Sequence, residues 1–535
     1  MKDRQLTLRG MVIGTIGSVI ITCSSMFIAL KLSSLPWPIM FVALFSMVCL
    51  KALGNTTLNE INVTHTAMSA GAMVAGGLAF TIPGIYILNP KAQVSTLTLM
   101  VIALGGTVLG LIFTSLIRKY FIEKENLPYA MGQAAADTLI VGDKGGKKSI
   151  LLFVSMGLAG IFAVLRDWFT AIPSVWFSQK MLKFGSYGGF YISPMLVAIG
   201  YIVGPVFIGV WFLGALIGDF GILIGGQHFG FFDAATATNV KQSLGIGMMV
   251  GTGVGILIKG IIPKAKDIFG AMFSKDMIGD SIIGMRWAPF ALAGIAALFA
   301  TVCHMGVVAS LITIIGVWLA TSMSSQCVGQ SGINPMEIFG IIFLLAAKAV
   351  TSIDGTEAFY VAAIVAVACG LVGDCMNDFK AGYIMHTDPK AQWIAEAIGG
   401  IIGAVVSVFV FSFLIKAYGA GSFSDGTFAA AQSHAVAAMV GGISNPLSFW
   451  IGLIVAAVLY CLNFPVMTLG LGIYLPFYLS ATAFIGGALR FIVDKVKPGM
   501  EEKEATGQII ASGVLGGEGV VGVIIALIVA AQAIS

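Results

Sequence analysis

The sequence predicts an all-α membrane protein that crosses the bilayer many times. Of the 535 residues, 58% are hydrophobic and only 10% are charged, whereas a soluble domain carries about 25% charged residues, mostly on its wetted surface. Apolar runs recur along the whole chain. Their lengths are close to the roughly 20 residues that a membrane-spanning helix needs. This composition excludes a soluble enzyme, a nucleic-acid-binding protein and a disordered scaffold.

The first apolar run, 10–32, follows the basic residues Lys2, Arg4 and Arg9. Its basic flank is like that of a signal peptide, but the run is longer than a signal-peptide core and no A-x-A cleavage site follows, so we expect a retained span. The first half has seven further runs: 36–53, 65–88, 94–117, 149–165, 192–204, 205–226 and 243–262. The second half has nine: 287–303, 304–321, 334–350, 357–374, 393–415, 427–442, 447–462, 465–492 and 508–534. We expect about 16 segments, some of them interrupted or re-entrant.

Basic loops predict the orientation in the membrane. The loop 118–148 holds six basic residues: Arg118, Lys119, Lys124, Lys144, Lys147 and Lys148. The loop 263–286 holds four: Lys264, Lys266, Lys275 and Arg286. The positive-inside rule puts both loops in the cytoplasm. Four predicted spans precede the first loop and four more lead to the second, so we expect a multi-pass protein of the cell (inner) membrane with a cytoplasmic N-terminus.

The loop 263–286 divides the chain into two halves, which we expect to be related membrane domains at 1–275 and 276–535. Each half begins with two closely spaced apolar runs and then a polar, apparently helix-breaking stretch, 55–65 or 324–335. Interrupted segments at corresponding positions of a duplicated chain are typical of transporters and mark the binding site. A coincidence between two polar loops is the alternative.

These two stretches provide the candidate substrate-binding residues. Asn334 suits a helix N-cap, Pro335 the first helical position and Glu337 the partner of a capping box. A helix that begins within the membrane presents free N–H groups that can hold a substrate carboxylate. The full candidate set is Asn62, Thr64, His65, Gln330, Ser331, Asn334 and Glu337. The alternative is a pair of well-capped helix ends that bind nothing.

Glu518 is the first candidate for proton coupling, because it sits within the last apolar run. A carboxylate there costs about 3 kcal/mol, so it is expected to be protonated or paired. Asp219 and Glu357 are further candidates, and a structural hydrogen bond to a neighbouring helix is the alternative role for Glu518. Gly517-x-Gly519-x-x-Gly522 matches a dinucleotide fingerprint, but no strand precedes it, so we interpret it as helix packing.

Other glycines and acids have more ordinary interpretations. Gly247, Gly251 and Gly255 are spaced as a helix-packing face. Asp374 and Asp378 are expected to begin a cytoplasmic stretch made of an interfacial turn and an amphipathic helix. Asp374, Glu396 and the remaining ionisable groups in or near apolar runs are also functional candidates by default.

No motif indicates a cofactor, a metal site or an enzyme. The seven cysteines form no CxxC pair, which argues against zinc. Walker A, HExxH and GxSxG motifs are also missing from the sequence, so we expect neither ATP hydrolysis nor intramembrane proteolysis. A TVGYG filter is likewise missing, and many glycine-interrupted spans suit a moving transporter better than a fixed pore.

The order of several short motifs resembles the oligopeptide transporter family, in its short prokaryotic form related to the yellow-stripe metal-chelate transporters. The motifs are Gln5–Met11, Glu60–Gly71, Phe80–Pro83, Asn126–Gly132, Gly329–Pro335, Asp374–Tyr383, Gly472–Pro476 and Ala511–Glu518. The resemblance implies about 16 spans in two related halves and proton-coupled uptake of small peptides or peptide-like chelates. It also suggests a homodimer in which a transport part moves against a scaffold.

We therefore expect a secondary active transporter, a proton-coupled symporter that imports small oligopeptides or peptide-like compounds by alternating access. A metal-chelate carrier and a sodium-coupled carrier of small metabolites are the alternatives within transport. An intramembrane enzyme is the alternative from another class. The expected partners are the substrate, protons and the lipid bilayer, and no nucleic acid.

Overall fold

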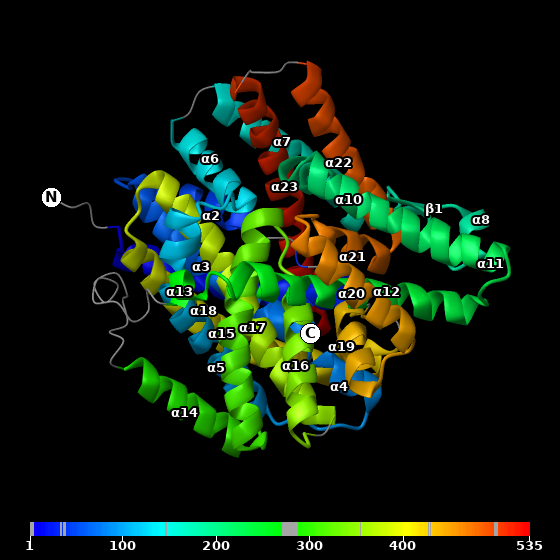
Figure 1. The fold of residues 1–535 in the computed structure, drawn as a ribbon. Helices are drawn as coiled ribbons and strands as arrows, with labels where there is room; N and C mark the ends of the chain where they lie inside the picture. Colours follow the sequence, from blue (N-terminus) through cyan, green and yellow to red (C-terminus); the bar gives the residue numbers. More distant parts are fainter. Residues whose placement is uncertain are drawn as a thin grey trace. The chain divides into compact units, whose positions relative to one another are not determined.

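The computed structural model describes residues 5–32, 35, 39–144, 147–269, 287–353, 355–425, 427–428, 430–496 and 501–534. Lys2, Arg4, Lys275 and Arg286, used above for the orientation, lie outside these residues. The described part has ten helices long and apolar enough to cross a membrane, or eleven if α19 and α20 form one broken span. This confirms the all-α, polytopic fold class (Figure 1). The number of about 16 stays a prediction.

The chain forms two compact units, each assembled from separate segments. Unit 1 contains 1–140, 260–442 and 526–535, and unit 2 contains 141–259 and 443–525. Each half of the sequence therefore begins in unit 1 and continues in unit 2. This alternation is what two related halves would give, although the division into related halves at 275 stays a proposal.

Unit 1 is built from long helices and a few short turns. Its helices are α1 (Leu8–Leu32), α2 (Ile39–Ala52), α3 (Leu58–Ala79), α4 (Pro83–Leu88), α5 (Thr96–Arg118), α6 (Ala130–Lys144), α13 (Ala265–Phe269), α14 (Ala288–Thr301), α15 (Gly306–Ser331), α16 (Met336–Val350), α17 (Gly355–Met385), α18 (Pro389–Tyr418) and α19 (Ala431–Gly441), with a π-helical end η1 (Lys119–Lys124) and a 3-10 turn η7 (Ala420–Phe423). Helix α6 leads from unit 1 into unit 2. Helix α17 lies at the centre, since its most apolar stretch is entirely buried inside the protein.

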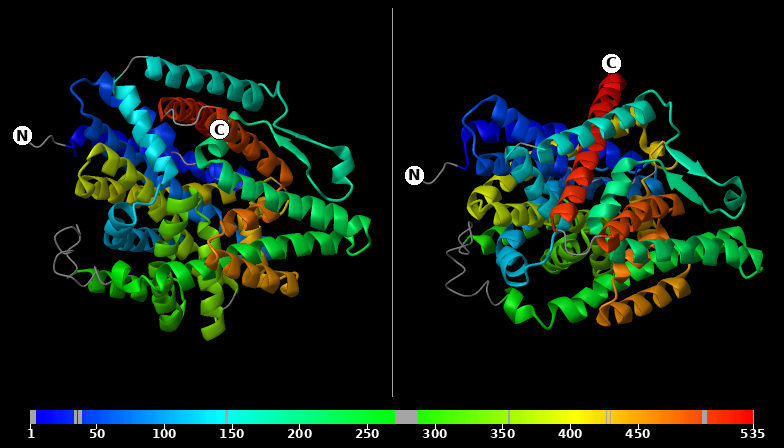
Figure 2. Two further views of the ribbon diagram at one scale, coloured as in Figure 1. Left: turned by 45° about the horizontal axis from the view of Figure 1, so that its top comes forward. Right: turned by 90° about the horizontal axis from the view of Figure 1, so that it is seen from above.

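Unit 2 combines helices with a small hairpin. Its elements are α7 (Lys147–Ala163), η2 (Val164–Trp168), β1 (Val175–Phe177), α8 (Gln179–Leu182), β2 (Gly189–Tyr191), α9 (Pro194–Val203), α10 (Pro205–Ala215), η3 (Leu216–Gly225), α11 (Gly226–His228), α12 (Ala234–Gly255), η4 (Ile256–Ile261), α20 (Pro446–Cys461), α21 (Val466–Tyr474), α22 (Phe477–Val496) and α23 (Glu501–Ile534), whose last turns belong to unit 1. Strands β1 and β2 form an antiparallel hairpin (Figure 2), and Trp176 of β1 stacks on Phe190 of β2. This hairpin was not predicted from the sequence.

Two predicted helix boundaries are wrong. The stretch 55–65 does not break a helix, because α3 already begins at Leu58, with the Thr57 hydroxyl accepting a hydrogen bond from the Glu60 N–H. The polar side chains from Glu60 to His65, which suggested a loop, are instead buried in α3. The apolar run 465–492 is two helices, α21 and α22, because the chain extends at Leu475 before Pro476.

The predicted glycine face of α12 is confirmed. A β-carbon at Gly247 or Gly251 would collide with the backbone carbonyl of Phe449 or Leu453 in α20, and one at Gly255 would meet Tyr460. The helices approach so closely because these positions carry no side chain.

Candidate functional site

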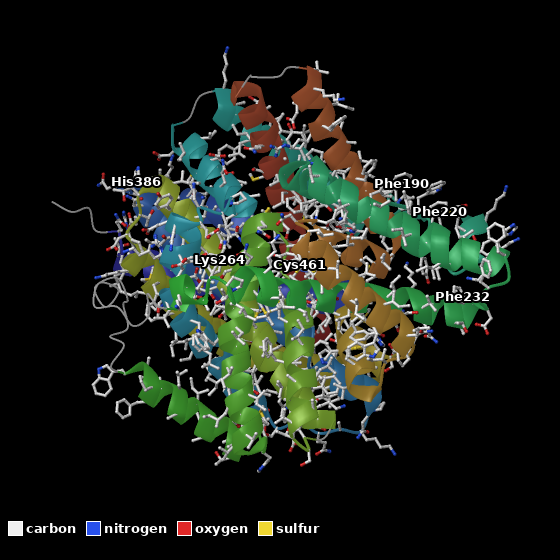
Figure 3. The ribbon with its side chains drawn as sticks, in the orientation of Figure 1. Phe190, Phe220, Phe232, Lys264, His386 and Cys461 are labelled. Atoms are coloured by element: carbon white, nitrogen blue, oxygen red, sulfur yellow. The ribbon has the colours of Figure 1, made fainter. Side chains whose placement is uncertain are left out.

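The candidate site lies in unit 1 where α3, α17 and α18 pack together. Helices α3 and α18 cross at small residues: a β-carbon at Gly399 would meet the Ala67 carbonyl, and one at Gly403 would meet the Gly71 Cα. The turn between α17 and α18 holds His386 at a positive φ of 59° (Figure 3). This turn returns the chain so that α18 runs back beside α3 and α17.

Three buried carboxylates converge at this crossing. Asp374 and Asp378 are one turn apart on α17, and Glu396 comes from α18; all three side chains are fully buried. One oxygen from each lies within 4.8 Å of the others. Two full charges at that separation repel by about 3.5 kcal/mol at an effective dielectric constant of about 20. The three carboxylates therefore require a compensating positive charge, which either a bound cation or protons can provide.

Helix α3 presents a histidine and a hydroxyl to the same carboxylates. The Ser69 hydroxyl donates to Asp378 Oδ2 at 2.8 Å. His65 is fully buried, and its Nε2 lies 3.2 Å from Asp378 Oδ1. From α18, Gln392 Nε2 donates to the Asp378 backbone carbonyl at 2.8 Å. Asp378 is thus the residue at which all three helices meet.

A chain of hydrogen bonds fixes the tautomer of His65. The Thr387 hydroxyl donates to Asn59 Oδ1 at 2.8 Å, so it accepts the hydrogen bond from Asn62 Nδ2 at 3.0 Å. The Asn62 carbonyl oxygen is then the atom that faces His65 Nδ1, at 3.2 Å. Because this oxygen can only accept, Nδ1 carries a proton. In a neutral ring the other nitrogen, Nε2, would be an acceptor facing a carboxylate.

Basic side chains of unit 1 lie elsewhere. In the described part of the chain, no lysine or arginine pairs with Asp374, Asp378 or Glu396. Lys380 donates to Asn126, and Arg118 pairs with Glu123. The carboxylate oxygens of Asp374 and Glu396 also accept no hydrogen bond from a described residue. The site thus has a large excess of acceptors, which is the environment that a proton or another small cation requires.

The opposite side of α17 holds the segment that leads into α6. Asn377 Oδ1 accepts from the Gly132 N–H at 3.0 Å, and Lys380 Nζ donates to Asn126 Oδ1 at 2.8 Å. Tyr129, with φ of 43°, donates from its N–H to the Gly329 carbonyl. One stretch of α17 therefore carries the acids and also anchors the entry to α6.

The first-half candidates separate into two groups. Asn62 and His65 belong to the buried network described above. Thr64 points to another neighbour, because its hydroxyl faces Gly10 on α1. Only part of the predicted 62–65 set therefore converges.

The second-half candidates lie around the break between α15 and α16. Asn334 does not cap α16, contrary to expectation: the N-cap position is Pro335, and the Asn334 amide donates to the Cys369 carbonyl at 2.8 Å while its oxygen accepts from Ser324. Gly332, at φ of 70°, ends α15. Ser331 folds back onto the Cys327 carbonyl, Gln330 is exposed and Glu337 is buried in the first turn of α16.

Two of the three predicted proton-coupling residues, Glu518 and Asp219, lie in unit 2, and each of these two has a cationic partner. Glu518 accepts from Arg166, from the Ser193 hydroxyl and from the Met195 N–H, each at 2.7 Å. Asp219 accepts from Lys241 at 2.7 Å and from the Ser186 hydroxyl at 2.6 Å. Glu357 is half-buried in the first turn of α17 in unit 1.

Asp374 and Asp378 do not lie at an interfacial turn, contrary to expectation. They continue α17, which runs to Met385 and is buried almost throughout. The signal was present, since two acids at a spacing of four lie on one helix face and a third acid follows in the next apolar run. The polar residues of 374–380 suggested a turn at the membrane surface, so the buried acid pair was missed.

Comparisons with known proteins agree with this architecture. The family model described as OPT oligopeptide transporter protein matches residues 5–529. The chain belongs to the OPT oligopeptide transporter family. It is 24% identical to the Haemophilus influenzae protein named "Putative oligopeptide transporter", with 95% of this chain and 93% of that protein covered. A shorter stretch, 10% of each chain, is 40% identical to metal-nicotianamine transporter YSL2 of Arabidopsis thaliana. OPT membership confirms the resemblance inferred from the motifs, including the relation to metal-chelate transporters.

Proposed function

We propose that this OPT protein is a proton-coupled symporter that imports small oligopeptides or peptide-like compounds by alternating access. Its family match over residues 5–529 supports transport as the general activity. The names of its relatives support a peptide or a metal-chelating compound as the cargo. The basic loops favour the cell membrane with a cytoplasmic N-terminus, so the symporter would work inward with the usual proton gradient.

The buried acids of unit 1 carry the proton-coupling part of the proposal. Asp374, Asp378 and Glu396 are fully buried, and no lysine or arginine among the described residues pairs with them. A carboxylate in an apolar interior is stable only when it is neutralised, so its charge state must change with the surroundings. A transporter can use that change because a neutral cluster prefers a dry conformation and a charged cluster a wetted one.

The proposed substrate contacts remain those of the two helix ends: Asn62, Thr64, His65, Gln330, Ser331, Asn334 and Glu337. The α15–α16 break is the better supported half, because non-helical backbone at membrane depth is tolerated only beside protein or a wet cavity. The first turn of α16 has no side-chain N-cap. Its free N–H groups would suit the carboxyl end of a peptide or chelate.

Other functions predict different behaviour. A metal-chelate carrier would take a metal-loaded chelator and refuse the metal-free form. A sodium-coupled carrier would lose uptake when sodium is replaced at constant pH. An intramembrane enzyme would release chemically altered substrate, visible by mass spectrometry. The suggested homodimer is a separate proposal, which the mass of the detergent-solubilised protein would test.

The deciding experiment is electrogenic transport by purified protein in liposomes with an imposed pH gradient. The panel contains dipeptides to hexapeptides, glutathione and a metal chelate. A current that requires both a peptide and the gradient would support the proposal. A response to the chelate alone would reassign the cargo, and silence across the panel from correctly folded protein would overturn the proposal.

A further inference from the structure

We propose that Asp374, Asp378 and Glu396 together with His65 form the proton site of this transporter, and that the site holds two exchangeable protons. This inference rests on the proposed proton coupling and says where the protons bind and how many there are. It differs from the assignment made from sequence, in which Glu518, Asp219 and Glu357 are the candidates for proton coupling. It follows from the hydrogen-bond acceptors that lack a donor where α3, α17 and α18 pack together.

The first proton belongs to the contact between His65 and Asp378. Asn62 requires a hydrogen on His65 Nδ1, so a neutral ring would turn the lone pair of Nε2 toward Asp378 Oδ1, 3.2 Å away. Two acceptors at that distance repel each other. One further proton, on either the ring or the carboxyl group, turns the repulsion into attraction. Ser69 already satisfies the other oxygen of Asp378, so the proton is held on the histidine side.

The second proton is shared by Asp374 and Glu396. Oxygens of these carboxylates lie within 4.8 Å of each other and of Asp378, and neither group accepts a hydrogen bond from a described residue. Two carboxylates sharing a buried site keep one proton between them because they cannot both ionise. With two protons, the charge of the four groups falls from −3 to −1.

The surrounding charges do not remove the need for these protons. Helices α3, α4, α5, α15, α16, α18 and α19 and the π-helical end η1 pack against α17. Among their charged groups, Glu60 pairs with Arg9, Arg118 pairs with Glu123, and Lys348 donates to the Val440 carbonyl, while Lys380 of α17 itself donates to Asn126. Lys390 and Lys416 on α18 are exposed, Glu337 lies in the first turn of α16, His434 of α19 contacts the Phe423 carbonyl, and the Cys327 and Cys375 thiols are buried. His65 is the only group in the described site that can become a cation beside the acids.

Unit 2 provides an internal contrast. Arg166 stands 2.7 Å from Glu518, and Lys241 stands 2.7 Å from Asp219. Each of these acids is neutralised by a fixed positive charge, which the acids of the cluster lack. The two kinds of buried acid therefore make opposite predictions in one experiment.

The test is a proton count on purified, full-length protein in detergent, without any substrate. Potentiometric titration from alkaline to mildly acidic pH gives the protons bound by the wild type and by E396Q, H65Q, the double variant and E518Q. We expect E396Q and H65Q each to bind one proton fewer, the double variant two fewer, and E518Q the same number as the wild type. Infrared spectra should show a protonated carboxylic acid that is lost in E396Q.

Several outcomes would overturn the inference. Unchanged counts in E396Q and H65Q from folded protein would do so, and so would a proton lost in E518Q instead. Loss of the carboxylic acid band on adding Mn²⁺ at constant pH would reassign the cluster to a metal ion. Because no cargo is present, a failed transport assay would refute the proposed function without affecting this result.

Discussion

Glu518 and Arg166 illustrate at the scale of single residues how a buried charge depends on its partner. The pair is almost fully buried, at 3% and 4% side-chain exposure. In E518Q, Arg166 keeps its second partner, Asp167, but the Ser193 hydroxyl and the Met195 N–H lose their carboxylate acceptor. A buried donor left unsatisfied costs about 1–3 kcal/mol, so we expect E518Q to lower the stability of the folded protein by that amount, measured by thermal unfolding in detergent. The matched control is D494N, which breaks the more exposed Arg490–Asp494 pair and should cost less than about 1 kcal/mol.

The same residue shows what sequence alone does not reveal about a buried acid. A lone glutamate in a glycine-rich span is conspicuous, whereas its partner Arg166 is 352 positions away in sequence. Sequence identified Asn62 and His65 from their polarity, but only the folded chain reveals that they join Asp378. Which acids are paired and which are not is a property of tertiary contacts, so periodicity and composition could not predict it.

Glu125 provides a pH-dependent test outside the spanning helices. The Tyr120 hydroxyl and Lys264 (Figure 3) hydrogen-bond its carboxylate and hold the pKa of Glu125 below its ordinary value. A carboxylate with a lowered folded-state pKa stabilises the protein above its unfolded-state pKa, and this contribution fades as the pH falls through the folded-state pKa. The melting-temperature difference between wild type and E125Q should therefore be small but positive near neutral pH and should vanish in acid. A difference that grows on acidification would contradict this expectation.

At the scale of elements, the close crossing of α3 and α18 depends on glycines, which have no side chain. A β-carbon at Gly399 would overlap the Ala67 carbonyl. We expect G399A to cost about 1–3 kcal/mol, because the backbone must move to make room. Thermal unfolding measures the loss. The control is G294A in α14, where nothing lies within 4 Å of the added carbon; there alanine should stabilise the helix by about 0.5–1 kcal/mol.

Element boundaries were predictable where glycine or proline dictates the backbone. The glycine face of α12 and the break before α16 both followed from sequence. The start of α3 did not, because Asn62, Thr64 and His65 have polar side chains that look like a loop until their partners on other helices are known. Local propensity is a weak guide wherever tertiary hydrogen bonds satisfy buried polar groups.

At the scale of the whole molecule, the proton count determines how strongly the transporter can concentrate its cargo. One pH unit is worth about a tenfold accumulation of a neutral substrate per coupled proton, and about a hundredfold for two. We expect the wild type in liposomes to follow the steeper relation. E396Q should keep exchange of substrate down its own gradient but lose most of the accumulation driven by pH.

The control for this experiment is D425N, which removes an exposed carboxylate in the segment after α18. It should accumulate substrate as the wild type does. Accumulation by E396Q that still rises a hundredfold per pH unit would refute the role of the cluster in coupling.

The interleaving of the two units also has a consequence for biosynthesis. Ser69 and Asp378, which meet in the acid cluster, are separated by 309 residues. While the first half is being inserted, α3 already carries Asn62, His65 and Ser69 into the membrane, and their partners have not been translated. The translocon or water must shelter these polar groups until α17 and α18 arrive. A ribosome stalled after residue 275 should therefore leave α3 accessible to a water-soluble thiol reagent at a cysteine placed at Ser69, and release to full length should protect it.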